Sequence, residues 1–372
     1  MKTVTRRWTR CLITAGALAL AAFTRLPAAE SAPAGQPVPA SDARFRYEGR
    51  FDLADPAAPV VVWQASRIAL DFEGDAVTLQ FDEVKGQNYF DLTIDGHRSL
   101  IELREGADPR GTHYVGLGAG RHQLRLFKRS EATAGTARFR GVTLAGGAPA
   151  FAPAAPAYRT ALLFIGDSIT VGACNEDGES DQWENRRTHN NALSYGAMTA
   201  AEFGADYRNI AVSGMGIVTG YVPFTAGEVW NRIAPDPKSP LADLSTWTPA
   251  VIFVNFGEND DSHSRVLKQD FPAAAFTTGY VALVRAIRAA YPQATIVSLR
   301  GGMFGGAQSE RLRGPWQAAV AELERTDPHV THYVFAHWAR MHPRVPDDRA
   351  MADELVAWLK RQPFFTPSPQ AR

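Results

Sequence analysis

The stretch Leu162-Leu163-Phe164-Ile165-Gly166-Asp167-Ser168 constrains the fold of this chain more than any other. Four consecutive apolar residues are typical of a strand that is buried on both faces, as in a parallel sheet. In open parallel sheets, ligands bind just beyond the carboxyl ends of the strands. Because Ser168 follows such an end, the sequence predicts a serine at the rim of a crevice. Taken alone, Gly-Asp-Ser is also an ordinary turn sequence.

Composition sets broad limits on what the protein does. The chain has 372 residues, which is long enough for two domains, and 45% of them are hydrophobic and 21% charged. The formal net charge is zero. This balance gives no support to nucleic acid as a partner, since nucleic-acid binding usually needs a basic surface.

The N-terminus is typical of a secretory signal. Arg6, Arg7 and Arg10 precede the apolar run Cys11–Phe23, which is too short to span a bilayer. We therefore expect a signal peptide over residues 1–29, a secreted or periplasmic protein, and no membrane association after cleavage. Only Cys174 would then remain, so no internal disulfide is expected. We interpret Cys174 as a packing residue, because no adjacent charge would lower its pKa.

Residues 44–146 show the period of β-strands. Apolar and polar residues alternate over Val77–Phe81 and Phe90–Ile94, and Asp95-Gly96 then supplies a hairpin turn. Many short strands without a helical period predict an all-β sandwich of the jelly-roll kind. Residues 30–43 before it are small and Pro-rich, which predicts a flexible lead-in. The sandwich is either a passive support, or it binds carbohydrate or forms one wall of the active site.

Beyond a linker at residues 147–159, the pattern changes to alternating strands and helices. Apolar runs and helical segments follow one another through residues 160–362, before a C-terminal tail at 363–372. This alternation predicts a three-layer α/β/α domain with a parallel sheet. The expected helices are 192–204, 273–291, 309–325 and 347–360.

Polar residues follow several of the predicted strands. Ser213-Gly214 follows the second strand, Gly257-Glu258-Asn259-Asp260 follows the third, and His337 and His342 lie near the end of the last. The carboxyl ends of parallel strands meet at one edge of the sheet. A serine nucleophile, a histidine base and amide donors for an oxyanion would therefore come together there, and these are the parts of a serine esterase.

These blocks resemble those of the SGNH (GDSL-type) hydrolase superfamily. The resemblance rests on Gly166-Asp167-Ser168, Gly214, Gly257-Glu258-Asn259-Asp260 and His342. It implies that Ser168 and His342 are catalytic. It also implies that the oxyanion hole is made by the Ser168 amide, the Gly214 amide and the Asn259 side chain.

Further features resemble carbohydrate esterase family 2. They are the preceding β-sandwich, the run Gly166-Asp167-Ser168-Ile169-Thr170, and the segments 191–196 and 209–214. The resemblance implies an esterase that removes O-acetyl groups from a polysaccharide or oligosaccharide of the xylan or glucomannan type. It implies neither a cofactor nor a catalytic metal.

One departure from the superfamily concerns the third member of the triad. The position three residues before His342, where the superfamily usually has Asp, is Ala339. We therefore expect a Ser-His dyad in which a main-chain carbonyl accepts the His342 Nδ1 proton, as in some family 2 esterases. Asp347 and Asp348 are expected to cap the last helix. His342 is preferred to His337 as the base because His337 lies almost on the strand.

Other functions are considered as alternatives. An α/β-hydrolase is excluded because Thr170 stands where its Gly-x-Ser-x-Gly motif needs Gly. A metal-dependent deacetylase lacks clustered ligands in the sequence. The remaining alternatives are a lipid or thioester hydrolase with an acyl tunnel in the segment 216–248, and an inactive carbohydrate-binding protein. The binding protein would use tryptophans as sugar platforms: Trp183, Trp230, Trp247 and Trp338.

Overall fold

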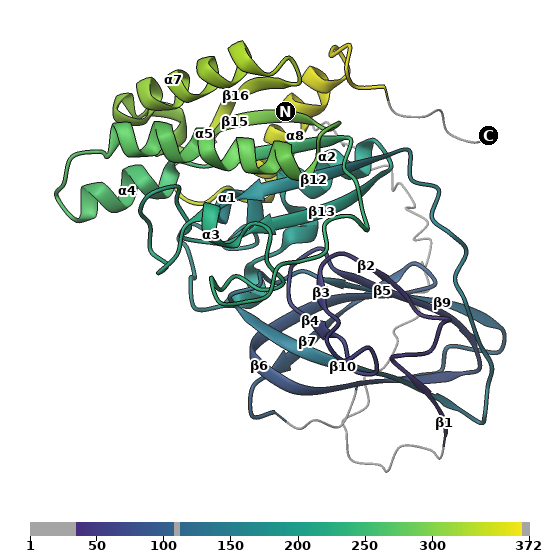
Figure 1. The fold of residues 1–372 in the computed structure, drawn as a ribbon. Coiled ribbons are helices and arrows are strands. Elements are labelled where there is room, and N and C mark those ends of the chain that lie inside the picture. Colours follow the sequence, from purple (N-terminus) through teal and green to yellow (C-terminus); the bar gives the residue numbers. More distant parts are fainter. Residues whose placement is uncertain (1–34, 108–111, 367–372) are drawn as a thin grey trace, which may run out of the picture.

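A computed structural model describes residues 35–107 and 112–366, and it shows an all-β domain joined to an α/β domain (Figure 1). The predicted signal peptide, with Cys11, lies outside the described residues. Among the described residues, no helix combines the length and the apolar character needed to cross a bilayer. The predicted fold classes, an all-β domain followed by an α/β domain with a parallel sheet, are confirmed.

The all-β domain is a sandwich built around one long strand, β6 (Ala76–Ile94). The first part of β6 pairs with β10 and β8, and its last part pairs with β7 and β9, so this strand passes from one sheet to the other. The strands of the domain are β1 Gly35–Pro39, β2 Arg46–Glu48, β3 Phe51–Asp52, β4 Val60–Val61, β5 Arg67–Glu73, β6, β7 His97–Arg104, β8 Thr112–Val115, β9 Arg121–Lys128, β10 Gly135–Ala145 and β11 Ala150–Phe151.

Three boundaries of the sequence prediction change. Gly35–Pro39 pairs with β10, so the described part of the expected lead-in belongs to the sandwich. β11 pairs with β5, so the linker begins after Phe151. At the other end, Phe365 is buried against Phe203 with ring centroids 4.7 Å apart, so the α/β domain includes the start of the expected tail. The Asp95-Gly96 turn joins β6 to β7 as predicted, with positive φ at both residues.

The α/β domain has a sheet of five parallel strands in the order β13-β12-β14-β15-β16. Its strands are β12 Thr160–Gly166, β13 Ala205–Ala211, β14 Val251–Asn255, β15 Thr295–Met303 and β16 Val330–Ala339. Its helices are α1 Ser168–Val171, the 3-10 turns η1 Arg186–Thr188 and η2 Asn191–Leu193, α2 Tyr195–Glu202, α3 Ala226–Val229, α4 Glu258–Val266, α5 Ala273–Ala290, α6 Phe304–Gln308, α7 Glu310–Thr326 and α8 Val345–Leu359.

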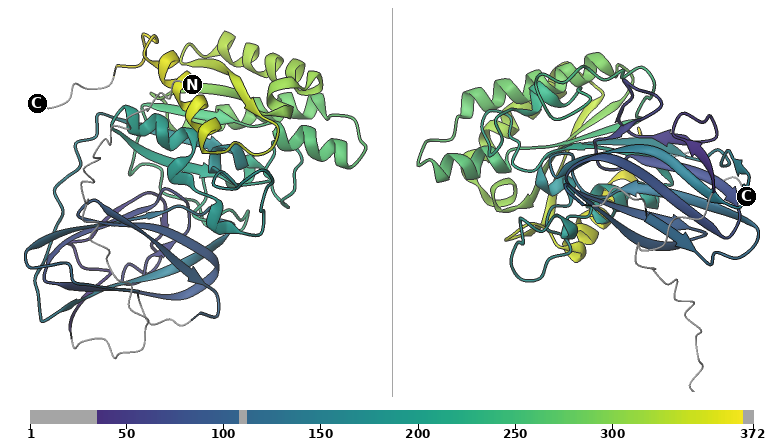
Figure 2. Two further views of the ribbon diagram at one scale, coloured as in Figure 1. Left: turned by 180° about the vertical axis from the view of Figure 1, so that it is seen from behind. Right: turned by 90° about the horizontal axis from the view of Figure 1, so that it is seen from below.

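Helices cover both faces of this sheet, which gives the predicted three layers. Apolar residues of α3, α5 and α7 pack on one face, while those of α2 and α8 pack on the other. Figure 2 shows α8, in yellow, crossing the face away from α5 and α7. The four predicted helices correspond to α2, α5, α7 and α8. Helix α4, which carries Asn259, is not among the predicted helices.

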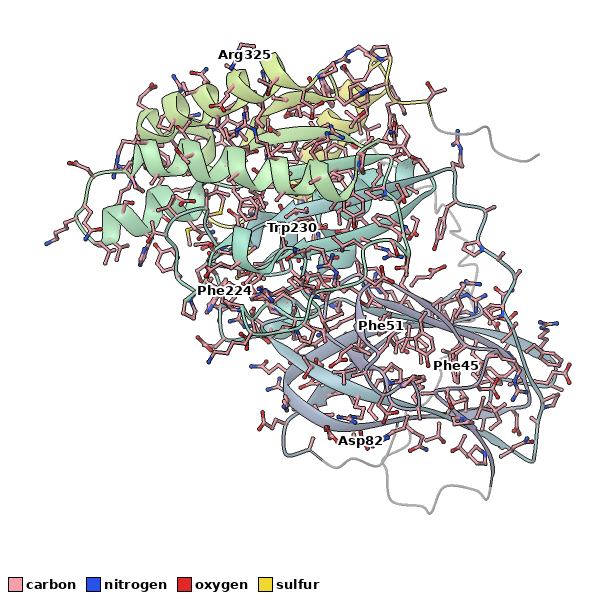
Figure 3. All side chains as sticks on the ribbon, viewed as in Figure 1. Phe45, Phe51, Asp82, Phe224, Trp230 and Arg325 are labelled. Atoms are coloured by element: carbon pink, nitrogen blue, oxygen red, sulfur yellow. The ribbon has the colours of Figure 1, made fainter. Side chains whose placement is uncertain are left out.

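The two domains share a bonded interface, which lies between the labelled residues Trp230 and Phe51 in Figure 3. The Trp63 indole donates to Ile233 O at 2.7 Å, and Arg50 donates to Trp230 O at the same distance. Both carbonyls belong to the segment 216–248. This segment therefore serves to join the domains.

Candidate active site

Ser168 lies where the sequence predicts it, directly after β12 and at the first position of α1. The Asp167 side chain caps this short helix by accepting a hydrogen bond from the Ile169 amide at 3.1 Å. Asn209 of β13 donates to Thr170 O at 2.9 Å and so holds the same turn from the neighbouring strand. Ser168 is 4% exposed. Its backbone is therefore fixed on two sides.

Gly214 follows β13, next to the Ser168 turn. The Val212 amide donates to Gly166 O at 3.2 Å, which joins the ends of the two strands. Gly214 has a φ of 81°, and a Cβ at this position would lie 3.0 Å from Tyr221 Cβ. Both the backbone conformation and the lack of space therefore favour glycine. The structure brings this amide to the same sheet edge as Ser168.

Asn259 is the second residue of α4, which follows β14. Its Nδ2 donates to Met215 O at 3.0 Å and to Asp167 Oδ2 at 3.3 Å. These two bonds connect the Gly214 segment, the Ser168 turn and α4. In the resting site the Asn259 amide is thus held by protein acceptors. The predicted oxyanion role would require the amide to share or release one of these bonds.

Asp260 fixes the loop beyond Gly214. Its carboxylate accepts from the backbone amides of Ile217, Val218 and Thr219 at 2.7–3.1 Å. Burial raises the pKa of Asp260, and the three amide bonds oppose that effect. The role of Asp260 is structural: it secures the loop that carries one of the predicted oxyanion donors.

The interior below Ser168 is unusually acidic. Burial, and then the Glu258 carboxylate, raise the pKa of Asp167 well above its usual range. Burial also raises the pKa of Glu258, whose side chain accepts from the Gly305 and Gly306 amides at 3.0 and 2.8 Å.

His342 is bonded to a carboxylate that the sequence did not single out. Its Nδ1 lies 2.7 Å from Asp181 Oδ2, and both side chains are largely buried. The expected main-chain carbonyl partner is therefore wrong. The residue at the usual superfamily position is still Ala339, and the acid comes instead from a loop 161 residues earlier in the chain.

Arg344 fixes Asp181 in place. Its guanidinium donates to Asp181 Oδ1 at 2.8 Å, to Cys174 O at 3.1 Å and to His342 O at 2.9 Å. Partial burial alone would raise the pKa of Asp181, but the bond from His342 and the charge of Arg344 lower it to about 2. Asp181 is therefore ionised at neutral pH. With Nδ1 directed at this carboxylate, Nε2 is the ring nitrogen that remains to accept a proton.

The other predicted residues near the last helix have separate roles. Asp347 lies in the first turn of α8, but the N-cap is Arg344 and not Asp347 as predicted. The Asp347 carboxylate accepts from the Arg344 amide at 2.9 Å, as in a capping box, and it also bonds His337 Nε2 at 2.8 Å. His337 lies on β16, so the preference for His342 agrees with the geometry. The cap prediction for Asp348 is wrong: this buried carboxylate accepts from the Tyr195 amide at 2.9 Å and braces α2 against α8.

Cys174 lies beside the histidine and acid. Potential ligand atoms of Cys174, Asp181 and His342 all lie within 4.8 Å of one another, which is close enough to hold one metal ion. However, Asp181 is already bonded to His342 and Arg344. Burial, and then the Asp181 carboxylate, raise the pKa of the Cys174 thiol. The thiol is therefore a poor nucleophile, as predicted, and the group is better explained as an acid–base pair.

Together these residues can perform acyl transfer. A serine, a histidine with a carboxylate on its far nitrogen, and amide donors lie along one sheet edge. Among the described residues no hydrogen bond joins the Ser168 hydroxyl to His342, and such bonds commonly tighten only when substrate binds. Asp181 was missed because it is one of four acids in the polar stretch 176–181. Nothing in that stretch distinguishes it from its neighbours.

Two family models match the chain. The model for the N-terminal domain of carbohydrate esterase 2 covers residues 47–153, and that of the GDSL-like lipase/acylhydrolase family covers residues 164–361. The two matches agree with the two domains of the structure.

Relatives with both domains are known. The chain is 30% identical to the cellulase/esterase CelE of Acetivibrio thermocellus over 85% of its own length, but it spans only 39% of that protein. It is 28% identical to an acetylxylan esterase / glucomannan deacetylase of Cellvibrio japonicus, covering 82% of this chain and 87% of the relative.

A solved structure is similar as well. It is a family two carbohydrate esterase from Clostridium thermocellum in complex with cellohexaose, with a TM-score of 0.73 and 28% identity. The match covers 85% of this chain and 98% of that one. The arrangement of sandwich and parallel sheet is thus shared across both domains.

Replacing Asn259 tests the oxyanion hole. We expect Asn259→Ala to lower kcat for an acetyl ester by roughly 100- to 1000-fold, with little change in KM, because the donor acts mainly once charge develops. Steady-state kinetics measure both constants, and circular dichroism controls for folding. An effect confined to KM would show that Asn259 only binds substrate.

Replacing Asp181 tests the newly found acid. Asp181→Asn leaves the shape of the side chain but removes the charge that orients His342, and we expect kcat to fall by roughly 100- to 10,000-fold. The matched control is Asp347→Asn, which alters a carboxylate bonded to the other histidine and should cost less than about threefold, because the Asn side-chain oxygen can still accept from the Arg344 amide. Equal losses in the two variants would rule out a specific role for Asp181.

Proposed function

We propose that this chain, which belongs to the GDSL-like lipase/acylhydrolase family and carries the N-terminal domain of carbohydrate esterase family 2, removes O-acetyl groups from polysaccharide of the xylan or glucomannan type. The observation that carries the proposal is the bond between His342 and Asp181 at the sheet edge that also holds Ser168 and Asn259. Oriented by this bond, His342 can act as the base that a serine esterase needs.

The reaction follows from these positions. His342 Nε2 takes the proton of Ser168 while Oγ attacks the acetyl carbonyl carbon. The Ser168 and Gly214 amides and the Asn259 side chain stabilise the oxyanion. The sugar oxygen leaves with the proton from His342, and water then releases acetate from Ser168 by the same steps. Asp181 holds the histidine tautomer and stabilises its cation, so the dyad expected from the sequence is replaced by a triad.

An exposed apolar surface beside His342 is the proposed contact for sugar rings. It consists of Phe304, Trp338 and Met341, which are 48%, 36% and 42% exposed. The Phe304 and Trp338 rings lie 6.2 Å apart. Aromatic rings stack on the apolar faces of sugar rings. A polysaccharide main chain needs such a surface near the acetyl ester that is cleaved.

The other three tryptophans are buried or pack against neighbouring side chains. Trp230 is buried, and Arg208 lies 4.2 Å over the Trp247 ring. Trp183 has Arg186 at 4.3 Å and the His342 ring at 5.7 Å. Its role is therefore to pack against the base. Of the four predicted platforms, Trp338 is the one with an exposed side chain.

The sandwich also contributes to the proposed binding surface. A pocket of about 460 Å³ lies between the two domains, with Gln87 and Arg104 on the sandwich side and Asp181–Asn185 on the other. Gln87 Nε2 donates to Glu184 O at 3.1 Å. Because the pocket reaches the catalytic acid, we propose that the sandwich forms one wall of the substrate site, which was one of the roles left open by the sequence.

The structure gives less support to a long acyl substrate. Segment 216–248 contributes to an interdomain pocket of about 600 Å³, and none of Ser168, Gly214, Asn259 or His342 lines it. An acyl tunnel would have to begin at the serine. We therefore favour the acetyl group over a fatty acyl chain.

Export of the protein is part of the proposal. It is supported by the basic and apolar segments of the first 29 residues and by a polymeric substrate that lies outside the cell.

An acetate-release panel tests the proposed function. We expect acetate from acetylated xylan or glucomannan, and rates on simple esters that fall as the acyl chain lengthens. Ser168→Ala should lower turnover by several orders of magnitude with the fold intact, because the covalent nucleophile is lost. Faster turnover of long-chain esters would support the lipid hydrolase, and carbohydrate binding without hydrolysis would support the inactive binding protein.

A second substitution tests the sugar surface. Trp338→Ala should raise KM for an acetylated oligosaccharide by roughly tenfold through the lost ring contact, and leave 4-nitrophenyl acetate turnover within about twofold. Phe364→Ala is the matched control, since it removes an equally exposed ring that packs on Trp358. Unchanged oligosaccharide kinetics in Trp338→Ala would remove this residue from the binding site.

A further inference from the structure

One segment of the sandwich reaches the catalytic machinery directly. Residues 129–132 follow β9, and their backbone is fixed within the sandwich. The Arg129 amide donates to Tyr89 O at 3.0 Å, and the Tyr89 amide donates to Ser130 Oγ at 3.0 Å. The segment is therefore a rigid projection of the sandwich and not a loose loop.

Glu131, at the centre of this segment, bonds two different parts of the active site. Its Oε2 accepts from the Ser213 amide at 2.9 Å, and its Oε1 accepts from Arg186 Nη1 at 3.1 Å. Ser213 directly precedes the oxyanion residue Gly214. Arg186 stacks on Trp183 in the loop that carries Asp181.

Because Glu131 is buried, the loss of either hydrogen bond would cost much free energy. The Glu131 side chain is 1% exposed. A buried carboxylate that loses a donor is left with uncompensated charge, which is strongly unfavourable. The Ser213 amide and the Arg186 guanidinium are therefore held at fixed positions relative to one carboxylate, and so to each other.

The neighbouring Arg129 reinforces the same connection. Its guanidinium pairs with Glu176 and donates to Arg187 O at 2.9 Å, and its carbonyl accepts from the Asn191 amide at 3.0 Å. These partners lie at both ends of the acid loop, residues 176–191. The sandwich thus holds both ends of the acid loop.

We propose that Glu131 is a positioning residue of the esterase. It fixes Ser213 and Gly214 relative to the acid loop, and it does so from outside the catalytic domain. The inference rests on the proposed function for its reaction, but it assigns the sandwich a further task beyond binding substrate. Catalysis depends on placing donors and base to within a fraction of an ångström, so a carboxylate that joins both groups acts on the rate without touching the substrate.

The test uses two kinds of reaction. One is hydrolysis of 4-nitrophenyl acetate, which makes few binding contacts. The other is reaction of Ser168 with a 4-nitrophenyl alkylphosphonate, in which the Oγ–P bond forms, nitrophenolate leaves and the serine proton passes to His342. The second reaction needs base and oxyanion hole but no acetylated sugar.

Glu131→Gln is the main variant. It removes the charge and one acceptor, so the Ser213 amide and Arg186 are no longer held at fixed positions relative to each other. We therefore expect kcat and the phosphonylation rate to fall roughly 30- to 100-fold, with KM within about twofold. Arg186→Ala, which cuts only the acid-loop side, should lower both rates roughly tenfold, and Arg186→Lys should recover most of the loss because it keeps the cation.

Two controls separate positioning from general damage. Asp95→Asn alters a sandwich carboxylate whose hydrogen-bond partners among the described residues, the Gln123 amide at 2.8 Å and His122, both belong to the sandwich. Arg187→Ala removes a neighbouring exposed arginine whose side chain makes no hydrogen bond among the described residues. Both should keep wild-type rates, and thermal unfolding is followed for every variant.

The outcomes are distinct. Losses in Glu131→Gln and Arg186→Ala, with both controls active, support the inference. If Glu131→Gln does not fold, the rates of the Arg186→Ala and Arg186→Lys variants alone decide between the outcomes. Wild-type rates in folded Arg186→Ala and Glu131→Gln would overturn the inference. Phosphonylation of the wild type without release of acetate from any sugar ester would refute the proposed substrate, while the role of Glu131 would still be measured.

Discussion

The proposed active site depends on one hydrogen bond, between His342 and Asp181. The histidine lies in the loop before the last helix, and the acid lies in the loop after the nucleophile turn. Arg344 bonds the acid, and its guanidinium also bonds carbonyls of Cys174 and His342. One arginine thereby couples the two loops, so that the base cannot shift without disturbing the segment that leaves the serine.

The sandwich completes this arrangement. A parallel sheet places loops at one edge, but it does not fix how far long loops stand from one another. Here Glu131 and Arg129 hold the acid loop and the Ser213 amide from outside the catalytic domain. Gln64 adds a bond to Asn209 at 2.7 Å, and Asn209 supports the Ser168 turn. In the proposed mechanism the two domains therefore form a single catalytic unit.

The sequence predicts the features that depend on local pattern. Ser168, Gly214 and Asn259 follow apolar strands, so their common edge follows from parallel topology, and Asp347 could be assigned to the N-terminus of the last helix. Asp181 and Glu131 could not be predicted, because their roles depend on contacts between distant loops and between domains. The rule that the acid precedes the histidine by three residues pointed to Ala339. It missed an acid that three-dimensional packing supplies from elsewhere.

The covalent intermediate gives the most direct test of this account. An acetylated xylo-oligosaccharide is mixed with the enzyme, the reaction is quenched within a single turnover, and the peptides are analysed by mass spectrometry. We predict one acetyl group on Ser168, accumulating in the wild type and forming far more slowly in Asp181→Asn. Acetate release without acetylation of Ser168, or acetylation of Cys174 instead, would contradict the assignment of the nucleophile and its triad.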